Sequence, residues 1–400
     1  MLVVQKFGGS SVANAERVRN VASIVADTYK EGNDVIVVVS AQGDTTDDLI
    51  EKAGELNPSA SKRELDMLMT AGEQISASLL AMAIDNMGLP VISLLGWQIG
   101  MKTDSNYGNA RIKTIDTERL SAEIAQKKIV IVAGFQGINK YDDITTLGRG
   151  GSDTTAVAIA AAMKADICHI YTDVDGVYTA DPRIVKNAKK LDEITYDEML
   201  ELATLGAQVL HNRSVEMAKK YNVNLEVRSS LERVEGTVVK EAIKMEKMLI
   251  RGVAKDDKVT RVSIVGIQDT PGMAYKIFSL LSAKKINVDI ILQSVGRDGT
   301  KDIVFTVASD QKEETIQALS SSDTVLSAQE VNYDDNVTKL SIVGAGMETH
   351  PGVASKMFEV LFSNDINIQM ISTSEIKISV LIDKKDSERA VKAVHDAFFA

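Results

Sequence analysis

The stretch Gly148-Arg149-Gly150-Gly151-Ser152-Asp153-Thr154-Thr155 decides the fold of this chain, because it joins a glycine turn to an alanine-rich helical segment. A short apolar strand is predicted at 167–171, and it runs into the acidic loop Thr172-Asp173-Val174-Asp175-Gly176-Val177-Tyr178-Thr179-Ala180-Asp181-Pro182-Arg183. A glycine turn at the start of a helix presents free backbone N–H groups and the positive end of the helix dipole, which suits an anion. The turn and the acidic loop together predict phosphate chemistry.

The same alternation of strand and helix extends over the first 230 residues. Strands are predicted at 2–6, 34–40, 91–95, 129–133, 167–171 and 224–227, and helices at 15–30, 62–87, 117–127, 153–164, 196–205 and 211–221. Continuous apolar strands are typical of strands buried on both faces. The pattern predicts an α/β fold, with a mostly parallel sheet sandwiched by helices. Ligands of such sheets bind beyond the carboxyl ends of the strands, where glycine-rich segments follow residues 6, 40, 133 and 171.

Composition limits the function classes. A chain of 400 residues with 44% hydrophobic residues predicts two or three globular domains, and a net charge of −11 argues against nucleic-acid binding. No apolar run is long enough to span a membrane and the first residues do not form a signal peptide, so we expect a cytoplasmic protein. The single cysteine, Cys168, lies in an apolar strand and is expected to be a small buried hydrophobe.

The last 150 residues contain an internal repeat. Residues 269–278 match 349–358 and residues 286–288 match 366–368, both at an offset of 80 residues (351 − 271). The pattern of each repeat predicts a ferredoxin-like βαββαβ unit. In the second repeat the position of the last strand would fall past residue 400, which would leave one edge of its sheet unpaired. We expect the apolar segment 249–254 to fill that edge. The predicted domains are therefore a catalytic domain at 1–230, a connecting helix or linker at 231–247, a first repeat at 256–335, and a second repeat made of 248–255 and 336–400.

Several of these segments together resemble the amino acid kinase superfamily, and most closely the aspartokinases within it. They are Lys6-Phe7-Gly8-Gly9-Ser10-Ser11, Ser40-Ala41-Gln42-Gly43, Ala71-Gly72-Glu73-Gln74 and the two stretches quoted at the start. The repeats, including residues 371–381, are similar to the tandem ACT domains of the same family. The resemblance covers essentially the whole chain. Walker A and Gly-x-Gly-x-x-Gly sequences are both lacking, which disfavours a P-loop enzyme and a dinucleotide-binding enzyme.

The resemblance implies a reaction. The γ-phosphoryl group of MgATP would pass to the β-carboxylate of L-aspartate and give 4-phospho-L-aspartate, the first step of lysine, threonine and methionine biosynthesis. A carboxylate with a reference pKa of ~3.9 is already ionised at neutral pH, so no general base is needed. The enzyme must instead bring two anions together and screen their charge. Mg²⁺ is expected to be carried mainly by the nucleotide, and no metal site on the protein is predicted.

The resemblance also implies roles for particular residues. The catalytic set is Lys6, which would screen the phosphoryl group, Asp153, which would support Lys6, and Arg149, which would clamp the α-carboxylate of aspartate. Glu73 would accept the α-ammonium group. The other substrate-binding residues are Thr46, Asp47, Gly150, Gly151 and Ser152. The nucleotide site is predicted at Lys6, Phe7, Gly8, Gly9, Ser10, Ser40, Thr172, Asp173, Tyr178 and Arg183.

One segment departs from the family pattern. Where the family commonly shows Gly-Ala-Lys-Val-Leu-His-Pro, this chain has Gly-Ala-Gln-Val-Leu-His-Asn at 206–212. Gln208 lacks the charge that a lysine would offer the ATP phosphates. Either Arg213 or Lys219 compensates for the missing charge, or the KM for ATP is raised. His211 is expected to start or pack a helix and not to take part in catalysis.

The repeats imply regulation by an end-product amino acid, lysine or threonine or both. The implied effector pocket draws on Asp269, Gly272, Ala274, Asn287, Asp289, Gln293, Val353, Ala354, Asn367, Ile368, Ser374 and Glu375. The acidity of Asp289 and Glu375 favours lysine. A homo-oligomer, dimer or tetramer, is expected to form through the ACT domains, and one or both repeats could serve only that purpose.

Two other functions stay open. Another amino acid kinase, acting on glutamate or acetylglutamate, is disfavoured by the tandem repeats and by Gly72-Glu73. A catalytically weak amino-acid sensor is supported only by Gln208.

Overall fold

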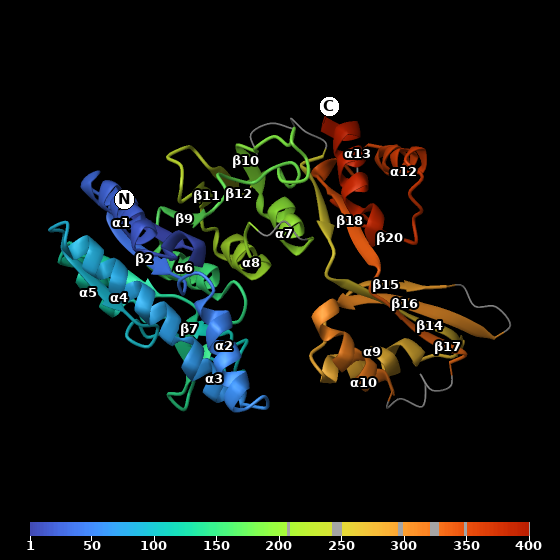
Figure 1. Cartoon of the computed structure of the whole chain (residues 1–400), viewed down its shortest axis with the longest axis horizontal. Coiled ribbons are helices and arrows are strands. Elements are labelled where there is room, and N and C mark those ends of the chain that lie inside the picture. The colour runs from blue at the N-terminus through green and yellow to red at the C-terminus, as the bar shows by residue number, and fades with distance from the viewer. Residues whose placement is uncertain (206–208, 242–249, 295–298, 321–327, 348–349, 400) are drawn as a thin grey trace. The chain divides into compact units, whose positions relative to one another are not determined.

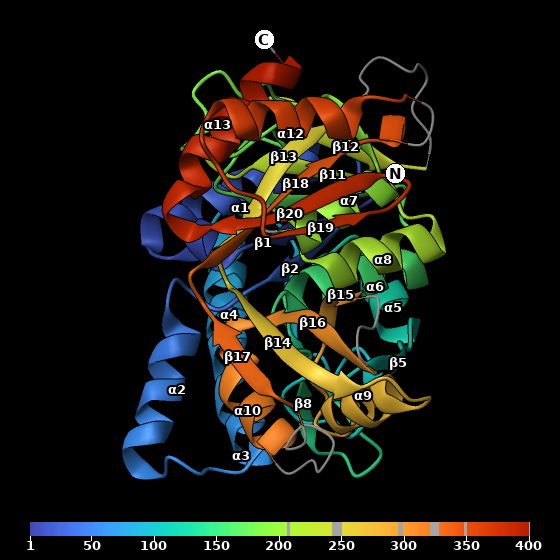
Figure 2. The same cartoon turned by 90° about the vertical axis from the view of Figure 1, so that its right-hand side faces the viewer.

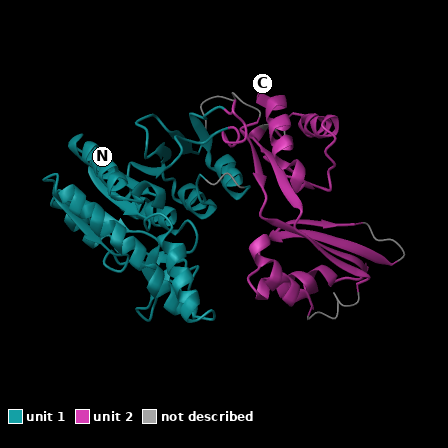
Figure 3. Cartoon of the chain, viewed as in Figure 1, with its two compact units in different colours: residues 1–178, 189–247 teal, residues 179–188, 248–400 magenta. Residues whose placement is uncertain are grey.

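The computed structural model describes residues 1–205, 209–241, 250–294, 299–320, 328–347 and 350–399. Figure 1 labels the helices and strands, and Figure 3 distinguishes by colour the two compact units that the chain forms. The first contains Met1–Tyr178 and Lys189–Lys247, and the second contains Thr179–Ala188 and Met248–Ala400. Each unit is described by itself.

The first unit is built on an eight-stranded sheet. Its strand order is β10-β12-β11-β9-β1-β2-β6-β3. All neighbouring strands are parallel except β11 and β12, which confirms the predicted mostly parallel sheet. The strands are β1 (Leu2–Phe7), β2 (Asp34–Val39), β3 (Val91–Leu94), β6 (Ile129–Ala133), β9 (Ile167–Thr172), β10 (Glu193–Thr195), β11 (Leu225–Ser229) and β12 (Thr237–Lys240).

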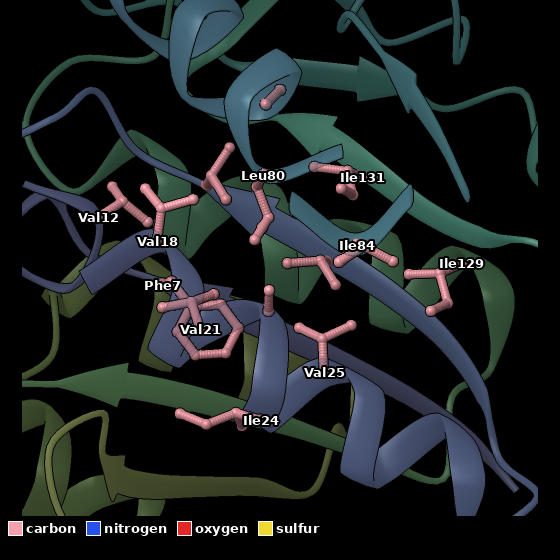
Figure 4. Close-up of a cluster of buried hydrophobic side chains, with 14 of the residues drawn as sticks. Phe7, Val12, Val18, Val21, Ile24, Val25, Leu80, Ile84, Ile129 and Ile131 are labelled. Atoms are coloured by element: carbon pink, nitrogen blue, oxygen red, sulfur yellow. The ribbon is translucent and has the colours of Figure 1, made fainter. Parts of the chain in front are cut away.

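Helices pack on both faces of this sheet. Figure 4 shows side chains of α1 (Ala15–Lys30) and α4 (Ala71–Asp85), among them Val21 and Leu80, in one cluster with Phe7 and Ile131 of the strands. The helix α6 (Gly151–Met163) packs against β1, β2 and β9. The remaining helices of this unit are α2 (Thr45–Leu56), α3 (Lys62–Met69), α5 (Glu118–Ala125), α7 (Tyr196–Thr204) and α8 (Asn212–Tyr221).

Some local structure differs from the sequence prediction. The helix predicted over 62–87 is two helices, α3 and α4, separated at Thr70. The helix α2 was not predicted. The short strands β4 (Lys102–Thr103), β5 (Ile112–Thr114), β7 (Gln136–Ile138) and β8 (Ile144–Thr146), which form a second sheet, were not predicted either. Strands of two or three residues are too short to show a periodic pattern.

The connecting helix predicted at 231–247 is wrong over Thr237–Lys240, which is strand β12. The branched pair Val238-Val239 favours a strand, and β12 pairs antiparallel with β11. Residues 242–247 lie outside the described part of the chain.

Among the described residues, one helical stretch, Lys62–Asp85, has the length and hydropathy of a membrane span. It is interrupted at Thr70, and its second half, α4, packs on α1, β3 and β6. Such packing is that of a core helix. Cys168 is also in the core, where burial raises the pKa of its thiol, as expected for a packing residue.

The second unit holds the two repeats, each with a four-stranded antiparallel sheet. The first repeat has the order β15-β16-β14-β17, from β14 (Val259–Gln268), β15 (Val288–Gln293), β16 (Thr300–Ala308) and β17 (Glu330–Asp334), with helices α9 (Met273–Ala283) and α10 (Lys312–Ser320). The second has the order β13-β18-β20-β19, from β13 (Gly252–Asp256), β18 (Val337–Val343), β19 (Met370–Thr373) and β20 (Lys377–Asp383). Its helices, α12 (Val353–Ser363) and α13 (Ser387–Phe399), lie on one face of that sheet in Figure 2.

The strand β13 fills the edge of the second repeat. It pairs antiparallel with β18, with Gly252 opposite Val343 and Asp256 opposite Lys339. This is the pairing that the sequence predicts for the segment before the first repeat, and it removes the bare edge of the sheet.

The segment Thr179–Ala188 belongs to the second unit, although the sequence placed it in the first domain. Ala180 and Val185 are buried in the same hydrophobic cluster as Leu340 and Val391. The Thr179 hydroxyl lies 2.9 Å from Nε2 of His395, and its carbonyl accepts a hydrogen bond from the Val253 amide. The acidic loop after β9 therefore begins in one compact unit and ends in the other.

Candidate active site

A buried ion pair lies at the carboxyl end of β1. The Lys6 ammonium is 2.6 Å from Oδ1 of Asp153, and the two side chains are only 12% and 10% exposed. Asp153 stands in the first turn of α6, where an acidic side chain also suits the helix dipole. The fold thus brings together two of the three predicted catalytic residues and holds a cation where ligands of parallel sheets bind.

The glycines after Lys6 let the backbone pass close to the end of β2. A Cβ atom at Gly9 would lie 2.7 Å from the carbonyl oxygen of Ala41, so no side chain fits there. The Gly43 amide donates to the Gly9 carbonyl, and the Ser40 amide donates to Phe7. The segments 6–11 and 40–43 therefore lie side by side.

The predicted nucleotide residues of these segments differ in what they can offer a ligand. Ser10 is exposed and Ser40 is partly buried. The ring of Phe7 is buried and stacks on Tyr171, with 4.5 Å between the ring centroids. Phe7 can therefore contribute its backbone to a nucleotide site, but its side chain belongs to the core.

Glu73 holds an unsatisfied carboxylate in the core of the site. The residue is 3% exposed, and its Oε1 accepts a hydrogen bond from the Ala41 amide at 3.1 Å. Its Oε2 is buried and has no hydrogen-bond partner in the described part of the chain. Burial raises the pKa of Glu73 to about 7. A buried, unpaired carboxylate oxygen is costly, and a cationic ligand such as an ammonium group would satisfy it.

The turn that carries Arg149 needs its glycines. Gly148 and Gly150 have φ values of +79° and +65°, which side chains rarely tolerate. A Cβ atom at Gly150 would lie 2.2 Å from Cγ of His211, so the imidazole packs directly on the turn. Burial lowers the pKa of His211, in keeping with the packing role expected for it.

The Arg149 turn faces solvent, whereas the helix start behind it is buried. Arg149 is exposed and has no ion pair within the described ranges, so its guanidinium is available to a ligand. Gly151 and Ser152 are buried in the first turn of α6, whose leading amides have no acceptor within the helix. Thr46 and Asp47 lie in the first turn of α2, partly buried and exposed respectively.

The loop after β9 is tied to the turn after β1. The Ser230 hydroxyl donates to the Thr172 carbonyl and accepts a hydrogen bond from Ser11 at 2.7 Å. The Thr172 hydroxyl donates to the exposed Asp173. Further along, the Tyr178 hydroxyl donates to Asp175, and burial together with that carboxylate raises the pKa of Tyr178 to about 12. Thr172, Asp173 and Tyr178 thus share the first unit with Lys6.

Arg183 does not share a compact unit with these residues. It belongs to the second compact unit, and its guanidinium pairs with Asp181 at 2.8 Å while remaining 85% exposed. The structure therefore does not group Arg183 with the other predicted nucleotide residues, and its contact with a nucleotide stays a prediction.

Both residues expected to compensate for Gln208 already have partners. Arg213 donates to two backbone carbonyls, and the Lys219 ammonium lies 2.6 Å from Asp197. Gln208 itself lies outside the described residues, so both alternatives stay predictions.

Two charged residues near the Arg149 turn hold its backbone: Asp66, which the sequence does not single out, and Arg213, which it names only as a charge to compensate for Gln208. Asp66 of α3 is fully buried and accepts hydrogen bonds from the Gly108 amide and from the amide and hydroxyl of Thr146. Arg213 of α8 donates to the carbonyls of Leu147 and Ala110. Each stands among helical residues of mixed polarity, where a charged side chain is ordinarily solvated, so only three-dimensional packing distinguishes it.

The predicted effector residues are distributed unevenly between surface and core. Asn287, Asp289, Gln293, Asn367, Ser374 and Glu375 are exposed. Gly272 caps α9 with a φ of +91°, whereas Val353 is buried in the core of the second repeat, and Ala274, Ala354 and Ile368 are partly buried against the cores of their own repeats. Asp269 pairs with Lys301, and Asp289 pairs with the buried Lys339 of the second repeat. The acidity that favours lysine therefore rests on Glu375.

Comparisons with known proteins agree with this architecture. The amino acid kinase family matches residues 1–229, and the ACT domain matches residues 262–322 and 340–398. The aspartokinase of Bacillus sp. (strain MGA3) is 52% identical over 398 residues, which are 99% of this chain and 97% of that protein.

Two solved structures of E. coli aspartokinase III are similar over the whole length of both chains. Its complex with aspartate and ADP (R-state) has 25% identity and a TM-score of 0.85. Its complex with lysine and aspartate (T-state) has 25% identity and a TM-score of 0.74. The 52% identity over nearly the full length, the two family matches and the common fold lead to one conclusion. The chain belongs to the amino acid kinase family and, within it, to the aspartokinases, which are kinases with ACT domains.

Proposed function

We propose that this enzyme transfers the γ-phosphoryl group of MgATP to the β-carboxylate of L-aspartate and forms 4-phospho-L-aspartate. The observation that carries the proposal is the buried Lys6–Asp153 ion pair at the carboxyl end of β1. Similarity to an aspartokinase solved with aspartate and ADP supports it. The product would enter the synthesis of lysine, threonine and methionine.

The proposed acceptor site binds the two ends of the amino acid separately. The exposed Arg149 guanidinium would clamp the α-carboxylate, because its fork matches a carboxylate in a bidentate manner. The unpaired Oε2 of Glu73 would accept the α-ammonium group. Thr46, Asp47, Gly150, Gly151 and Ser152 would line the remaining acceptor site, and the β-carboxylate would be left pointing towards Lys6.

The transfer itself requires charge screening more than acid–base chemistry. An oxygen of the β-carboxylate attacks the γ-phosphorus, the bond from that phosphorus to the bridging oxygen breaks, and ADP leaves with the electron pair. Lys6, held in place by Asp153, would screen the charge on the transferred group.

The nucleotide would lie over the backbone of Gly8, Gly9 and Ser10, beside Ser40, Thr172, Asp173 and Tyr178. Two successive glycines fit this use, because phosphate oxygens can approach a backbone without side chains closely. Mg²⁺, carried mainly by the nucleotide, would neutralise phosphate charge.

We further propose feedback inhibition by lysine, threonine or both at the ACT repeats, and a homo-oligomer formed through them. The matched ACT domains and the lysine complex of E. coli aspartokinase III support this. Initial rates measured with each amino acid, alone and together, would identify the effector. Light scattering would give the oligomeric state.

Trapping the acyl phosphate with hydroxylamine tests the proposed activity. The enzyme is incubated with MgATP and L-aspartate, L-glutamate or N-acetylglutamate, and the hydroxamate is measured. We expect hydroxamate from L-aspartate only. Product from one of the other acceptors would identify another amino acid kinase, and no product from any of them would favour a sensor.

A further inference from the structure

We propose that Arg213 is a positioning residue, which fixes the Arg149 turn so that Arg149 can receive the α-carboxylate of the acceptor amino acid. The inference rests on the proposed role of Arg149 and adds a residue to that site. Arg213 does not itself touch the substrate.

Arg213 contacts the backbone that leads into the Arg149 turn. It lies in the first turn of α8 and donates one hydrogen bond to the Leu147 carbonyl at 2.7 Å and another to the Ala110 carbonyl at 2.6 Å. Leu147 directly precedes Gly148 and Arg149 in the chain. A movement of the Arg213 guanidinium would therefore displace the entry to the turn.

The fully buried Asp66 holds the same two backbone segments. It accepts hydrogen bonds from Gly108, two residues before Ala110, and from Thr146, which directly precedes Leu147. The Ala110 amide also donates to the Thr146 carbonyl at 2.8 Å. A carboxylate and a guanidinium thus hold the two segments together, and the turn extends from this anchored base.

The other end of the turn rests on the same helix. His211, the residue that caps α8, packs against Gly150, while Arg213 holds Leu147. Arg149 lies between these two supports and is exposed. Because the backbone around it consists of glycines, which impose little conformational preference, the direction of Arg149 depends on contacts at both ends of the turn.

The chemistry of the contact requires arginine. Two carbonyl oxygens in different segments match the fork of a guanidinium, whereas a lysine ammonium acts as a point charge. Both carbonyls would otherwise be poorly solvated, since Leu147 and Ala110 are buried. Arg213→Lys therefore keeps the charge and loses the geometry.

The test compares the enzyme with Arg213→Lys and Arg213→Met. We expect the KM for aspartate to rise at least about tenfold in both variants, with the KM for ATP changed less than about twofold. The control is Lys220→Met, which removes an exposed charge from the same helix and should change neither constant. A purely structural role would lower the active fraction, and hence kcat, and would leave both KM values as they were.

A double-mutant cycle with Arg149→Lys decides whether Arg213 acts through Arg149. If it does, adding Arg213→Lys to Arg149→Lys has almost no further effect on kcat/KM for aspartate. Multiplicative losses would overturn the proposal, as would an unchanged KM in the folded Arg213→Lys enzyme. Should the enzyme phosphorylate another amino acid, the cycle is measured with that acceptor, so the two proposals fail separately.

Discussion

Glu73 has its carboxylate in a place where a negative charge is costly. Its ordinary pKa is 4.5, and burial raises this to about 7 in the folded protein. The folded state therefore binds the proton more tightly than the unfolded chain does. The contribution of Glu73 to the free energy of unfolding is therefore fully present below a pH of about 4.5 and is lost as the pH rises through about 7.

Replacement of Glu73 by glutamine should remove this loss. Glutamine keeps an oxygen for the Ala41 amide but cannot ionise, so we expect Glu73→Gln to be more stable than the original protein at pH 8, by up to about 3 kcal/mol. Urea unfolding without substrates, at pH 5 and pH 8, measures the difference. Equal stabilities at pH 8 would show that the carboxylate is not destabilised.

The ionised form of Glu73 should favour aspartate binding, whereas the protonated form favours the folded state. A protonated Glu73 cannot pair with the α-ammonium group, so we expect the KM for aspartate to rise about tenfold for each pH unit below about 7, and this dependence to vanish in Glu73→Gln. Initial rates between pH 5.5 and 8.5 test this. The KM for ATP, measured over the same range, serves as the control.

The charge missing at position 208 should be measurable in ATP binding. Since Arg213 and Lys219 are already engaged with other groups, we expect Gln208→Lys to lower the KM for ATP several-fold and to leave that for aspartate unchanged. Gln208→Met is the control without charge. An ATP affinity that is unchanged or weaker in the lysine variant would contradict the expectation.

At this scale, sequence motifs identified residues that the fold then brings together. Lys6 and Asp153 are far apart in the chain, yet their motifs predicted one site, and the structure joins them at 2.6 Å. Asp66 and the structural contacts of Arg213 could not be predicted, because both side chains bind backbone groups. Every residue has a backbone carbonyl and nearly every residue has an amide. The sequence therefore does not show which of these groups a side chain binds.

At the scale of secondary structure, the start of α4 presses against the end of β2. A Cβ atom at Gly72 would lie 2.7 Å from Cβ of Ala41, whose amide in turn holds Glu73. The close approach of helix and loop thus sets the depth of the Glu73 carboxylate. A glycine is needed there for space, since Gly72 has an ordinary helical backbone.

Two glycine-to-alanine changes in helices should therefore have opposite signs. Gly72→Ala is expected to lower the free energy of unfolding by about 1–3 kcal/mol and to raise the KM for aspartate, because α4 must move away from Ala41. Gly54→Ala, in α2 with open space around it, should raise stability by about 0.5–1 kcal/mol. Thermal and urea unfolding give both values, and a stable Gly72→Ala enzyme with an unchanged KM would contradict this account.

Strand and helix positions could be predicted where the elements are long and fully buried. The strand at Ile129–Ala133 matches its predicted range, and β1 and β2 differ by one residue. The strand β12, which lies between β10 and β11, could not be predicted, because Glu235 before it and Lys240 at its end are typical of a solvated helix. Its pairing with both neighbouring strands establishes it as a strand.

At the scale of the whole molecule, the loop after β9 connects residues proposed to bind the nucleotide to the repeats. Tyr178 belongs to the first unit, and Thr179, the next residue, is anchored in the second by His395. Thr179 has no exposed surface. The end of the loop that follows β9 is therefore folded as part of the second unit.

Loosening this anchor should alter the response to effectors. Thr179→Val removes the hydroxyl that faces Nε2 of His395, so hydrogen exchange should become faster in residues 179–188. We expect the effector concentration for half inhibition to change at least about threefold, with kcat in its absence nearly unaltered. Thr204→Val, on the exposed side of α7, is the control. Unchanged exchange and unchanged inhibition together would exclude such a link.

The strand β13 also dictates an order of events during synthesis. It leaves the ribosome before the whole of the first repeat, but its partner β18 is made only afterwards. The first repeat can therefore fold while β13 is still unpaired. The sheet of the second repeat can be completed only after β18 and the strands that follow it have been synthesised. Contacts of such long sequence separation form slowly. The second repeat should consequently be the last part of the nascent protein to become resistant to proteolysis, and its segment Thr179–Ala188 should remain unprotected until then.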